Sequence, residues 1–378
     1  MAFEHYITAG GKRLRRGYTT GTCAALAAAG AARLLLTGEA PPRLSLTTPM
    51  GLPVEVEPRI CRMEGEGALC LIEKDAGDDI DVTAGLLIGA RVERKPDPGI
   101  TIEGGPGVGR VTRPGLDQPV GEAAINHVPR EMIRRAVREA CTLWDYEGGL
   151  KVTILVPRGE EAAKKTFNPQ LGIEGGISIL GTSGIVEPMS LVALLDTIRL
   201  ELRQAAALGN RRVILTPGNY GMDFLHEHGL DSWDIPVVKC SNFIGETLDT
   251  AMEHGFEEVL LVGHAGKLVK LAGGIMNTHS RWADCRTELF CAYAALAGGG
   301  QELCRALMES PSADGCIALL DGAGLRGPVM EGLLTAIQTH LDRRSAGAFQ
   351  VGAVLFSNQY GLLGRTLGAE ELLQRWKK

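Results

Sequence analysis

Four short glycine-rich segments, each directly after an apolar run, are the parts of this sequence best suited to bind a ligand. They span residues 181–184, 216–221, 240–245 and 263–267. A glycine loop lets its backbone approach a ligand closely, because glycine has no Cβ atom. The first amides of a following helix lack intrahelical partners, so they can hold an anionic or polar group. The pattern predicts that these loops bind a ligand through their backbone.

The segment 177–190 carries the most complete form of this pattern. Residues 177–180 predict a short buried strand, the next four predict a tight turn, and Glu187 and Pro188 predict the start of a helix through Leu208. Open α/β sheets bind ligands beyond the carboxyl ends of their strands, and a turn that is merely tight is the alternative for this segment alone. The candidate ligand-binding residues are Gly181, Thr182, Ser183, Gly184, Glu187, Asn219 and Gly263.

His264 is the candidate catalytic residue, because it is a titratable side chain in one of these loops, beside Lys267. It could act as a base or donate a hydrogen bond to a ligand, and the alternative is a histidine that only orders its loop. Other chemistries lack a signature. There is no G-x-S-x-G elbow, the nine cysteines form no C-x-x-C pair, and His226 and His228 would point apart on a helix. No protein-bound metal is therefore expected.

A basic segment near the amino terminus predicts a second site. Lys12, Arg13, Arg15 and Arg16 precede Tyr18, Thr20 and Thr22, and an alanine-rich helix follows over residues 23–36. Basic side chains beside a hydroxyl-rich helix start could hold carboxylates or phosphates. A capped structural helix with a solvated basic arm is the alternative. The candidate residues are Arg13, Arg15, Arg16, Tyr18, Thr20, Thr22 and, from a later glycine-rich loop, Arg113.

Four aspartates between positions 75 and 81 lack the order of a calcium loop and predict a solvated acidic turn.

The elements that must position these residues form two groups. Short alternating runs over residues 43–105 predict an antiparallel or mixed sheet. Gly148 and Gly149 mark a boundary, and beyond them apolar strands alternate with helices, at 152–156, 177–180, 212–215, 237–239 and 259–262. Near-continuous apolar strands between helices are typical of a doubly wound, mostly parallel α/β domain. We expect an α+β domain over 1–148, completed by 281–378, and an inserted Rossmann-like domain over 149–280.

Composition limits the class of protein. The 378 residues are 45% hydrophobic and 22% charged, and the net charge of −6 argues against general nucleic-acid binding. The sequence has no run of about 18 apolar residues, so a membrane span is not expected. Its first residues do not resemble a secretory signal. Scattered cysteines predict reduced thiols in a cytoplasmic protein. The oligomeric state stays open, and a homo-oligomer is compatible with the sequence.

Several segments resemble a known family in the same order along the chain. They cover residues 16–25, 104–116, 181–190 and 263–274, and the similarity extends over roughly residues 12–290. The chain resembles the cobalt-precorrin-5B C(1)-methyltransferase family (CbiD) of anaerobic cobalamin biosynthesis. His127 and Ser241 depart from its pattern, since proline and glycine are expected there. Both departures fall in predicted loops and affect single site residues more than the family.

The resemblance implies methyl transfer from S-adenosylmethionine to ring carbon 1 of a cobalt-containing tetrapyrrole that bears carboxylates. It also implies a two-domain α/β enzyme, and we expect the second domain to bind the methyl donor and the first to bind the tetrapyrrole. Because the sulfonium is already activated, the enzyme must mainly align donor and acceptor. Two alternatives are a nicotinamide-dependent oxidoreductase, for which a G-x-G-x-x-G after a strand is missing, and a non-catalytic tetrapyrrole carrier.

Overall fold

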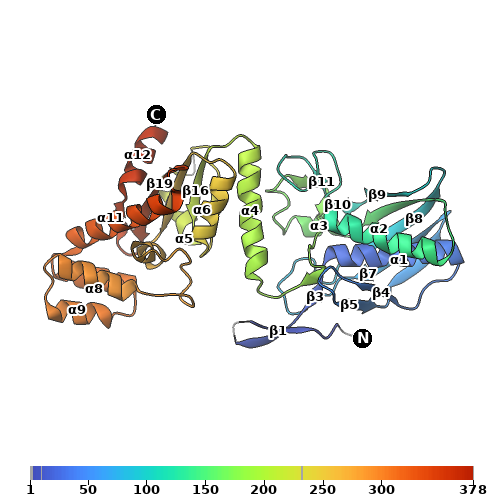
Figure 1. Cartoon of the computed structure of the whole chain (residues 1–378), viewed down its shortest axis with the longest axis horizontal. Coiled ribbons are helices and arrows are strands. Elements are labelled where there is room, and N and C mark those ends of the chain that lie inside the picture. Colours follow the sequence, from blue (N-terminus) through green and yellow to red (C-terminus); the bar gives the residue numbers. More distant parts are fainter. Residues whose placement is uncertain (1–2, 10, 231–232, 378) are drawn as a thin grey trace. The chain divides into compact units, whose positions relative to one another are not determined.

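A computed structural model of the chain describes residues 3–9, 11–230 and 233–377. The protein is a mixed α/β protein that divides into two compact units, Met1–Leu191 and Val192–Lys378. The buried hydrophobic residues of each unit form clusters of their own. Figure 1 labels many of the elements of both units.

The first unit is built around a five-stranded sheet with the order β6-β7-β8-β12-β9. Neighbouring strands are antiparallel, except that β12 and β9 are parallel. The strands are β6 (Ile60–Glu64), β7 (Gly67–Glu73), β8 (Leu87–Lys95), β9 (Ile100–Gly104) and β12 (Gly149–Leu155). Helix α1 (Thr20–Thr37) packs against β7, β8 and helix α2 (His127–Leu143). Its many alanines follow from this position, because the helix is covered on almost every side.

Helix α1 has the length and apolarity that a membrane-spanning helix would need, but 78% of the relevant window is buried inside the unit. A Cβ atom on its Gly30 would lie 2.7 Å from the Cys70 sulfur and 2.8 Å from a Leu44 methyl carbon. Such close packing is that of a core helix.

The second unit is built around a sheet with the order β17-β16-β18-β19-β20. Its first four strands are parallel and β20 is antiparallel. They are β16 (Arg212–Thr216), β17 (Val237–Lys239), β18 (Glu258–His264), β19 (Gln350–Ser357) and β20 (Gly361–Arg365).

Helices cover both faces of this second sheet. Val213 and Leu215 of β16 share a cluster with α4, α6 and α8 to α11, whereas Ile214 points to the other face, toward α5 and α12. The helices are α4 (Leu191–Ala207), α5 (Asn219–Glu227), α6 (Ile244–Glu253), α8 (Arg286–Leu296), α9 (Gln301–Met308), α10 (Ala313–Gly322), α11 (Arg326–Ser345) and α12 (Leu367–Trp376).

The remaining elements are short. They are β1 (Tyr6–Ala9), β2 (Lys12–Arg15), β3 (Gly17–Tyr18), β4 (Leu44–Thr47), β5 (Pro53–Val56), β10 (Gly107–Val108), β11 (Arg110–Val111), α3 (Gly159–Ala163), β13 (Ile173–Glu174), β14 (Gly176–Ile177), β15 (Ile185–Val186), α7 (Ala265–Leu268) and η2 (Val269–Gly273).

The boundary expected at Gly148 and Gly149 differs from the structure. Strand β12 begins at Gly149 and lies between β8 and β9 in the first sheet. A Cβ atom on Gly149 would lie 1.8 Å from the Asp97 carbonyl oxygen, so glycine is needed there for close backbone contact rather than as a linker. The compact units instead divide at Leu191.

The expected insertion is also corrected. Strand β19 pairs with β18 over seven residues, so the carboxyl-terminal part of the chain completes the second sheet and does not return to the first unit. The predicted strand 177–180 is absent from this parallel sheet, because β14 pairs with β10 of the first unit. Strand β15 follows the glycine loop and pairs with β3, and helix α4 begins only at Leu191.

Candidate functional site

The second sheet has a topological switch point between β16 and β18. After β16 the chain enters α5 on one face and continues to β17, whereas after β18 it enters the helices of the other face and continues to β19. The two connections diverge from neighbouring strands. A crevice therefore opens between them at the carboxyl edge of the sheet, where α/β proteins commonly bind ligands.

A cavity of about 600 Å³ lies at this switch point. The loops after β16 and β18 line it, together with the start of α10 and Arg286 of α8. Its lining residues are Thr216, Pro217, Gly218, Asn219, Tyr220, Gly221, Gly263, His264, Gly266, Lys267, Arg286, Ser312, Ala313 and Asp314. A larger hollow of about 900 Å³ follows α11 and the edge strand β20, away from the ends of the parallel strands. The smaller cavity is therefore the candidate site.

Glycine residues give the candidate site its shape. A Cβ atom on Gly221 would lie 1.7 Å from the Thr216 hydroxyl oxygen, and one on Gly263 would lie 3.0 Å from Leu268 and Pro217. These two glycines let the strand ends pack closely. Gly218 differs, because a Cβ atom there would meet no described atom within 4 Å, and its φ of 168° is ordinary extended backbone. Gly218 thus leaves open space within the cavity.

His264 presents an N–H group to the cavity. Its Nδ1 accepts a hydrogen bond of 3.0 Å from the backbone N–H of Gly266, so the ring proton is on Nε2. Nε2 lies 3.9 Å from Oδ2 of Asp314, whose Oδ1 accepts a 2.8 Å hydrogen bond from the Ser357 hydroxyl. The histidine was the candidate catalytic residue, and this geometry suits a hydrogen-bond donor that also orders its loop. It does not leave a free basic nitrogen at Nδ1.

Lys267 supplies a positive charge to the cavity. Its Nζ donates a 3.0 Å hydrogen bond to the Pro217 carbonyl, and this contact joins the loops after β16 and β18. Burial lowers the pKa of Lys267 below its usual 10.5, because removal of water disfavours the ammonium form. Arg286 forms a bidentate pair with Asp284 and faces the same cavity. The cavity can therefore hold a carboxylate at one end.

Three of the residues singled out in the sequence lie together at this site. Asn219, Gly263 and His264 all line the cavity. The amide oxygen of Asn219 accepts a 3.0 Å hydrogen bond from Lys239 at the end of β17.

The other candidate ligand-binding residues lie in the first unit and do not line this cavity. The loop with Gly181, Thr182, Ser183 and Gly184 lies on the start of α1. The Gly21 N–H donates to the Leu180 carbonyl, and the Thr22 hydroxyl donates to the Gly184 carbonyl at 2.6 Å. A Cβ atom on Gly181 would lie 2.4 Å from Thr19. The glycines of this loop thus permit contact with the protein's own helix.

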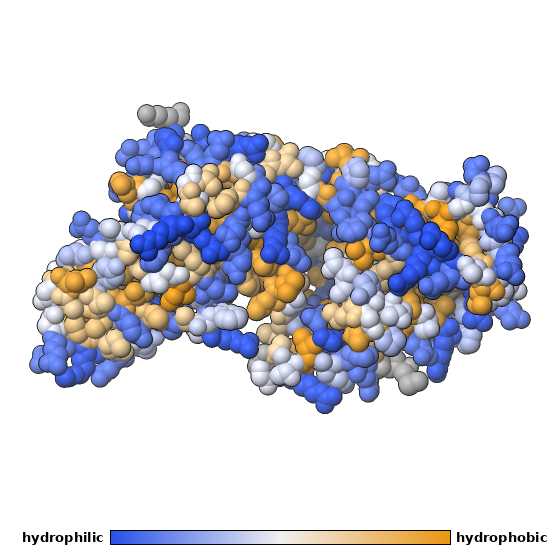
Figure 2. Space-filling model, in the orientation of Figure 1, coloured by the Kyte–Doolittle hydropathy of each residue, from blue (hydrophilic) through white to orange (hydrophobic). Residues whose placement is uncertain are grey.

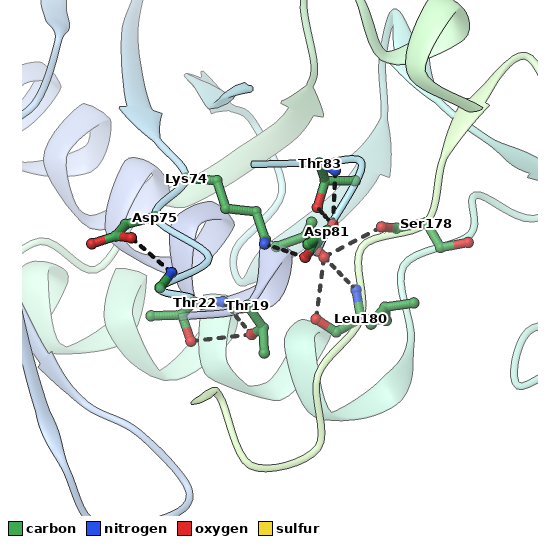
Figure 3. A network of polar contacts seen from close by, with 10 residues as sticks. Thr19, Thr22, Lys74, Asp75, Asp81, Thr83, Ser178 and Leu180 are labelled. Atoms are coloured by element: carbon green, nitrogen blue, oxygen red, sulfur yellow. Dashed lines mark hydrogen bonds and ion pairs between the residues drawn. The ribbon is translucent and has the colours of Figure 1, made fainter. Parts of the chain in front are cut away.

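Figure 3 shows that polar groups at the start of α1 form hydrogen bonds with other groups of the first unit. The Thr19 hydroxyl accepts from the Thr22 N–H at 3.2 Å, and the Leu180 N–H donates to the Thr20 hydroxyl at 2.9 Å. Among the described residues, this leaves the helix start without the open anion site that the sequence suggested. The hydroxyls of Thr20 and Thr22 instead fasten the glycine loop to α1.

Two of the four basic residues in the segment 12–16 form ion pairs. Arg15 forms a bidentate pair with Asp75 at 2.5 and 2.7 Å, and Arg16 forms a 2.5 Å pair with Glu187. Arg13 stacks over the Tyr6 ring. The acidic turn is paired rather than solvated as expected, since Asp81 also contacts the buried Lys74 at 2.6 Å.

Two further candidates of the tetrapyrrole side have structural roles in the first unit. Tyr18 is buried and donates its hydroxyl to the Glu73 carbonyl, and burial raises its pKa. Arg113 is exposed and donates to the Gln170 carbonyl.

Sequence reasoning missed the part of the cavity that α10 and Arg286 supply. Ser312 and Asp314 lie about 50 positions after His264 in a helical segment, and helix patterns do not encode which strand end a helix start will face. Tyr220 was only noted as part of a loop. Among the described residues, no group of three or more His, Cys, Asp or Glu side chains could hold a metal ion.

Known proteins are similar to this chain over nearly its whole length. Residues 7–188 match the CbiD family model, and residues 277–367 match that of the CbiD C-terminal domain. The chain is 48% identical to the cobalt-precorrin-5B C(1)-methyltransferase of Ruminiclostridium cellulolyticum, covering 94% of this chain and 92% of that protein. It is 42% identical to the same enzyme of Alkaliphilus metalliredigens, covering 98% and 97%. A crystal structure of the cobalamin biosynthesis protein cbiD from Archaeoglobus fulgidus is 31% identical, covering 73% of this chain and 86% of that one, with a TM-score of 0.39.

Proposed function

The chain belongs to the CbiD family, and we propose that its second unit binds the methyl donor in the cavity between β16 and β18. Its activity is that of the curated relatives, which are cobalt-precorrin-5B C(1)-methyltransferases of cobalamin biosynthesis. The proposed donor is S-adenosylmethionine. The proposal treats the second sheet, with helices on both faces, as a doubly wound, Rossmann-like donor domain. The observation that carries it is the coincidence of a switch point, a cavity and four lining glycines.

The groups around the cavity match the parts of such a donor. Lys267 and Arg286 suit its carboxylate, and Asp314 suits its amino group or ribose hydroxyls. Tyr220 is 62% exposed and lies 6.3 Å from His264 between ring centroids, so it can stack on the adenine at the mouth. Backbone amides near Gly218 and Gly266 can contact the remaining polar atoms, as the sequence suggested for Asn219 and Gly263.

The reaction needs alignment more than acid–base chemistry. An electron pair of the macrocycle forms the new bond from ring carbon 1 to the methyl group, while the carbon–sulfur bond breaks and its electron pair stays on sulfur. The products are the methylated macrocycle and S-adenosylhomocysteine. The residues of this chain orient the donor so that the methyl group points out of the cavity. His264 contributes a hydrogen-bond donor and a rigid loop.

Gly218→Val tests the donor site. The substitution fits the extended backbone and meets no described atom, so the protein should fold, but the new side chain occupies cavity space. We expect calorimetry to show at least about tenfold weaker binding of S-adenosylhomocysteine, the loss of about 1.4 kcal/mol. Gly300→Val is the matched control, because Gly300 also precedes a helix and faces open space, but lies outside the cavity. Equal affinity in wild type and Gly218→Val would place the donor elsewhere.

A further inference from the structure

Helix α4 extends well beyond the carboxyl edge of the second sheet. A short turn joins it to β16, and it folds back on that strand, since Ile198 and Leu202 share a cluster with Val213 and Leu215. The helix has 17 residues, or about 25 Å, whereas β16 has five, or about 17 Å. Burial raises the pKa of Glu201 and the charge of Lys239 opposes this shift, so the middle of α4 lies near the end of β17. The difference of about 8 Å corresponds to about five residues, so residues 191–195 overhang the sheet edge.

The apolar side of α4 that packs on the sheet continues toward the start of the helix, where its side chains are no longer buried. Residues 191, 194, 195, 198, 202 and 205 follow helical spacing and form one stripe. Ile198 is 1% exposed, whereas Leu194 is 40% and Leu191 is 50% exposed. Figure 2 shows hydrophobic side chains gathered over the lower part of α4. An uncovered apolar stripe at the carboxyl edge of the sheet is suited to an apolar ligand surface.

Basic side chains border the same sheet edge. Lys239 ends β17, Lys267 and Arg286 line the cavity, and Arg281 lies in the segment whose Thr278 hydroxyl bonds to Asn242. Arg281 has no ion-pair partner within the described ranges. The acidic residues of this edge are partly engaged as well: Asp284 pairs with Arg286 and Lys270, Asp314 lies 3.9 Å from His264, and Glu201 lies near Lys239. By contrast, a hollow of about 460 Å³ in the first unit is lined by Glu55, Glu57, Glu73 and Asp75, with Arg59 and Lys74. Charge thus favours the second unit for a ligand with many carboxylates.

We propose that the α4 overhang, formed by Leu191, Leu194 and Leu195, and the basic loops of this edge hold the tetrapyrrole that accepts the methyl group. A tetrapyrrole has a broad apolar face and a rim of carboxylates, which correspond to the stripe and to Lys239 and Arg281. The inference rests on the proposed function for the position of the donor. It places donor and acceptor at the same edge of the second sheet.

The test uses the full-length protein and two probes, cobyrinic acid as a stable cobalt corrin with many carboxylates, and S-adenosylhomocysteine. Leu191→Gln with Leu194→Gln removes the apolar contacts of two half-covered leucines. We expect about tenfold weaker binding of cobyrinic acid or more, and S-adenosylhomocysteine affinity within about twofold of wild type. Leu208→Gln is the matched control, because Leu208 is equally exposed at the opposite end of the same helix.

Unchanged cobyrinic acid affinity in the double variant would overturn the proposal. A changed elution volume on size exclusion would also overturn it, since the stripe would then be covered by a second copy of the chain. If the double variant fails to fold, Leu191→Gln alone decides, because that residue is half exposed. The two proposals can fail separately. If the leucine double variant loses cobyrinic acid binding while Gly218→Val still binds S-adenosylhomocysteine normally, only the proposed donor cavity is refuted.

Discussion

Lys267 is the residue whose protonation should matter most for donor binding. It is half-buried between two loops and donates to the Pro217 carbonyl, and its burial lowers the pKa. The ammonium form therefore exists only up to a pH below the usual lysine value of 10.5. Interaction with a donor carboxylate is present below that folded-state pKa and is lost as the pH rises through it.

We expect the affinity for S-adenosylhomocysteine to fall with rising pH before 10.5 is reached. The amino group of the ligand also titrates in alkaline solution, so Lys267→Arg serves as the comparison, because the guanidinium stays charged. Calorimetry from neutral to alkaline pH should show a steeper loss for the wild type than for Lys267→Arg. Parallel curves would mean that Lys267 does not contact the carboxylate.

Helix α1 and the glycine loop of residues 181–184 form one structural element rather than a ligand site. The Thr20 hydroxyl accepts from the Leu180 N–H and lies 3.2 Å from the Leu180 carbonyl and 3.3 Å from that of Ser178. All of these atoms lie in or beside the core of the first unit. An unpaired buried donor costs about 1–3 kcal/mol.

Thr20→Val keeps the side-chain shape but leaves the Leu180 N–H without its partner. We expect urea unfolding of the first unit to lose about 1–3 kcal/mol, with no change in S-adenosylhomocysteine affinity. Thr101→Val, at an exposed strand position of the same unit, should change stability by less than about 0.5 kcal/mol. Weaker donor binding in Thr20→Val would return this loop to the donor site.

The distribution of charge is the feature of the whole molecule that bears on the proposed binding of the tetrapyrrole. The chain carries a net charge of −6, so a substrate with many carboxylates must be captured by local positive potential. The arginines of residues 12–16 are largely used in pairs with Asp75 and Glu187. Arg281 at the edge of the second sheet is not paired within the part of the chain that the structure describes.

Arg281→Ala should therefore raise KM for the tetrapyrrole several-fold and flatten the salt dependence of kcat/KM, because one contact between a guanidinium and a substrate carboxylate is lost. Arg13→Ala is the matched change in the first unit, where the side chain stacks on Tyr6, and should alter both quantities less. The opposite ranking would assign the tetrapyrrole to the first unit, as the sequence suggested.

The family and the local elements could be predicted from the amino-acid sequence alone. The structure contains the strands predicted at 212–215, 237–239 and 259–262 and the helices that follow them. They could be predicted because the spacing of apolar residues and the glycines at turns are local features of the sequence. Two of the four glycine loops, after β16 and β18, line the cavity. Asn219, Gly263 and His264 could be found from their place at predicted strand ends alone.

The sheet that each strand joins could not be predicted, because it depends on contacts between distant parts of the chain. The apolar pattern of a strand predicts that it is buried but not which strands it pairs with. Strand β12 pairs with β9 in the first sheet, and β14 pairs with β10. The pairing of Arg15 with Asp75 joins positions 60 residues apart, and Asp314 reaches the cavity from 50 positions beyond His264. Charge pairing and site assembly depend on such distant contacts, which is why a free basic arm was expected from the sequence and a paired one is found.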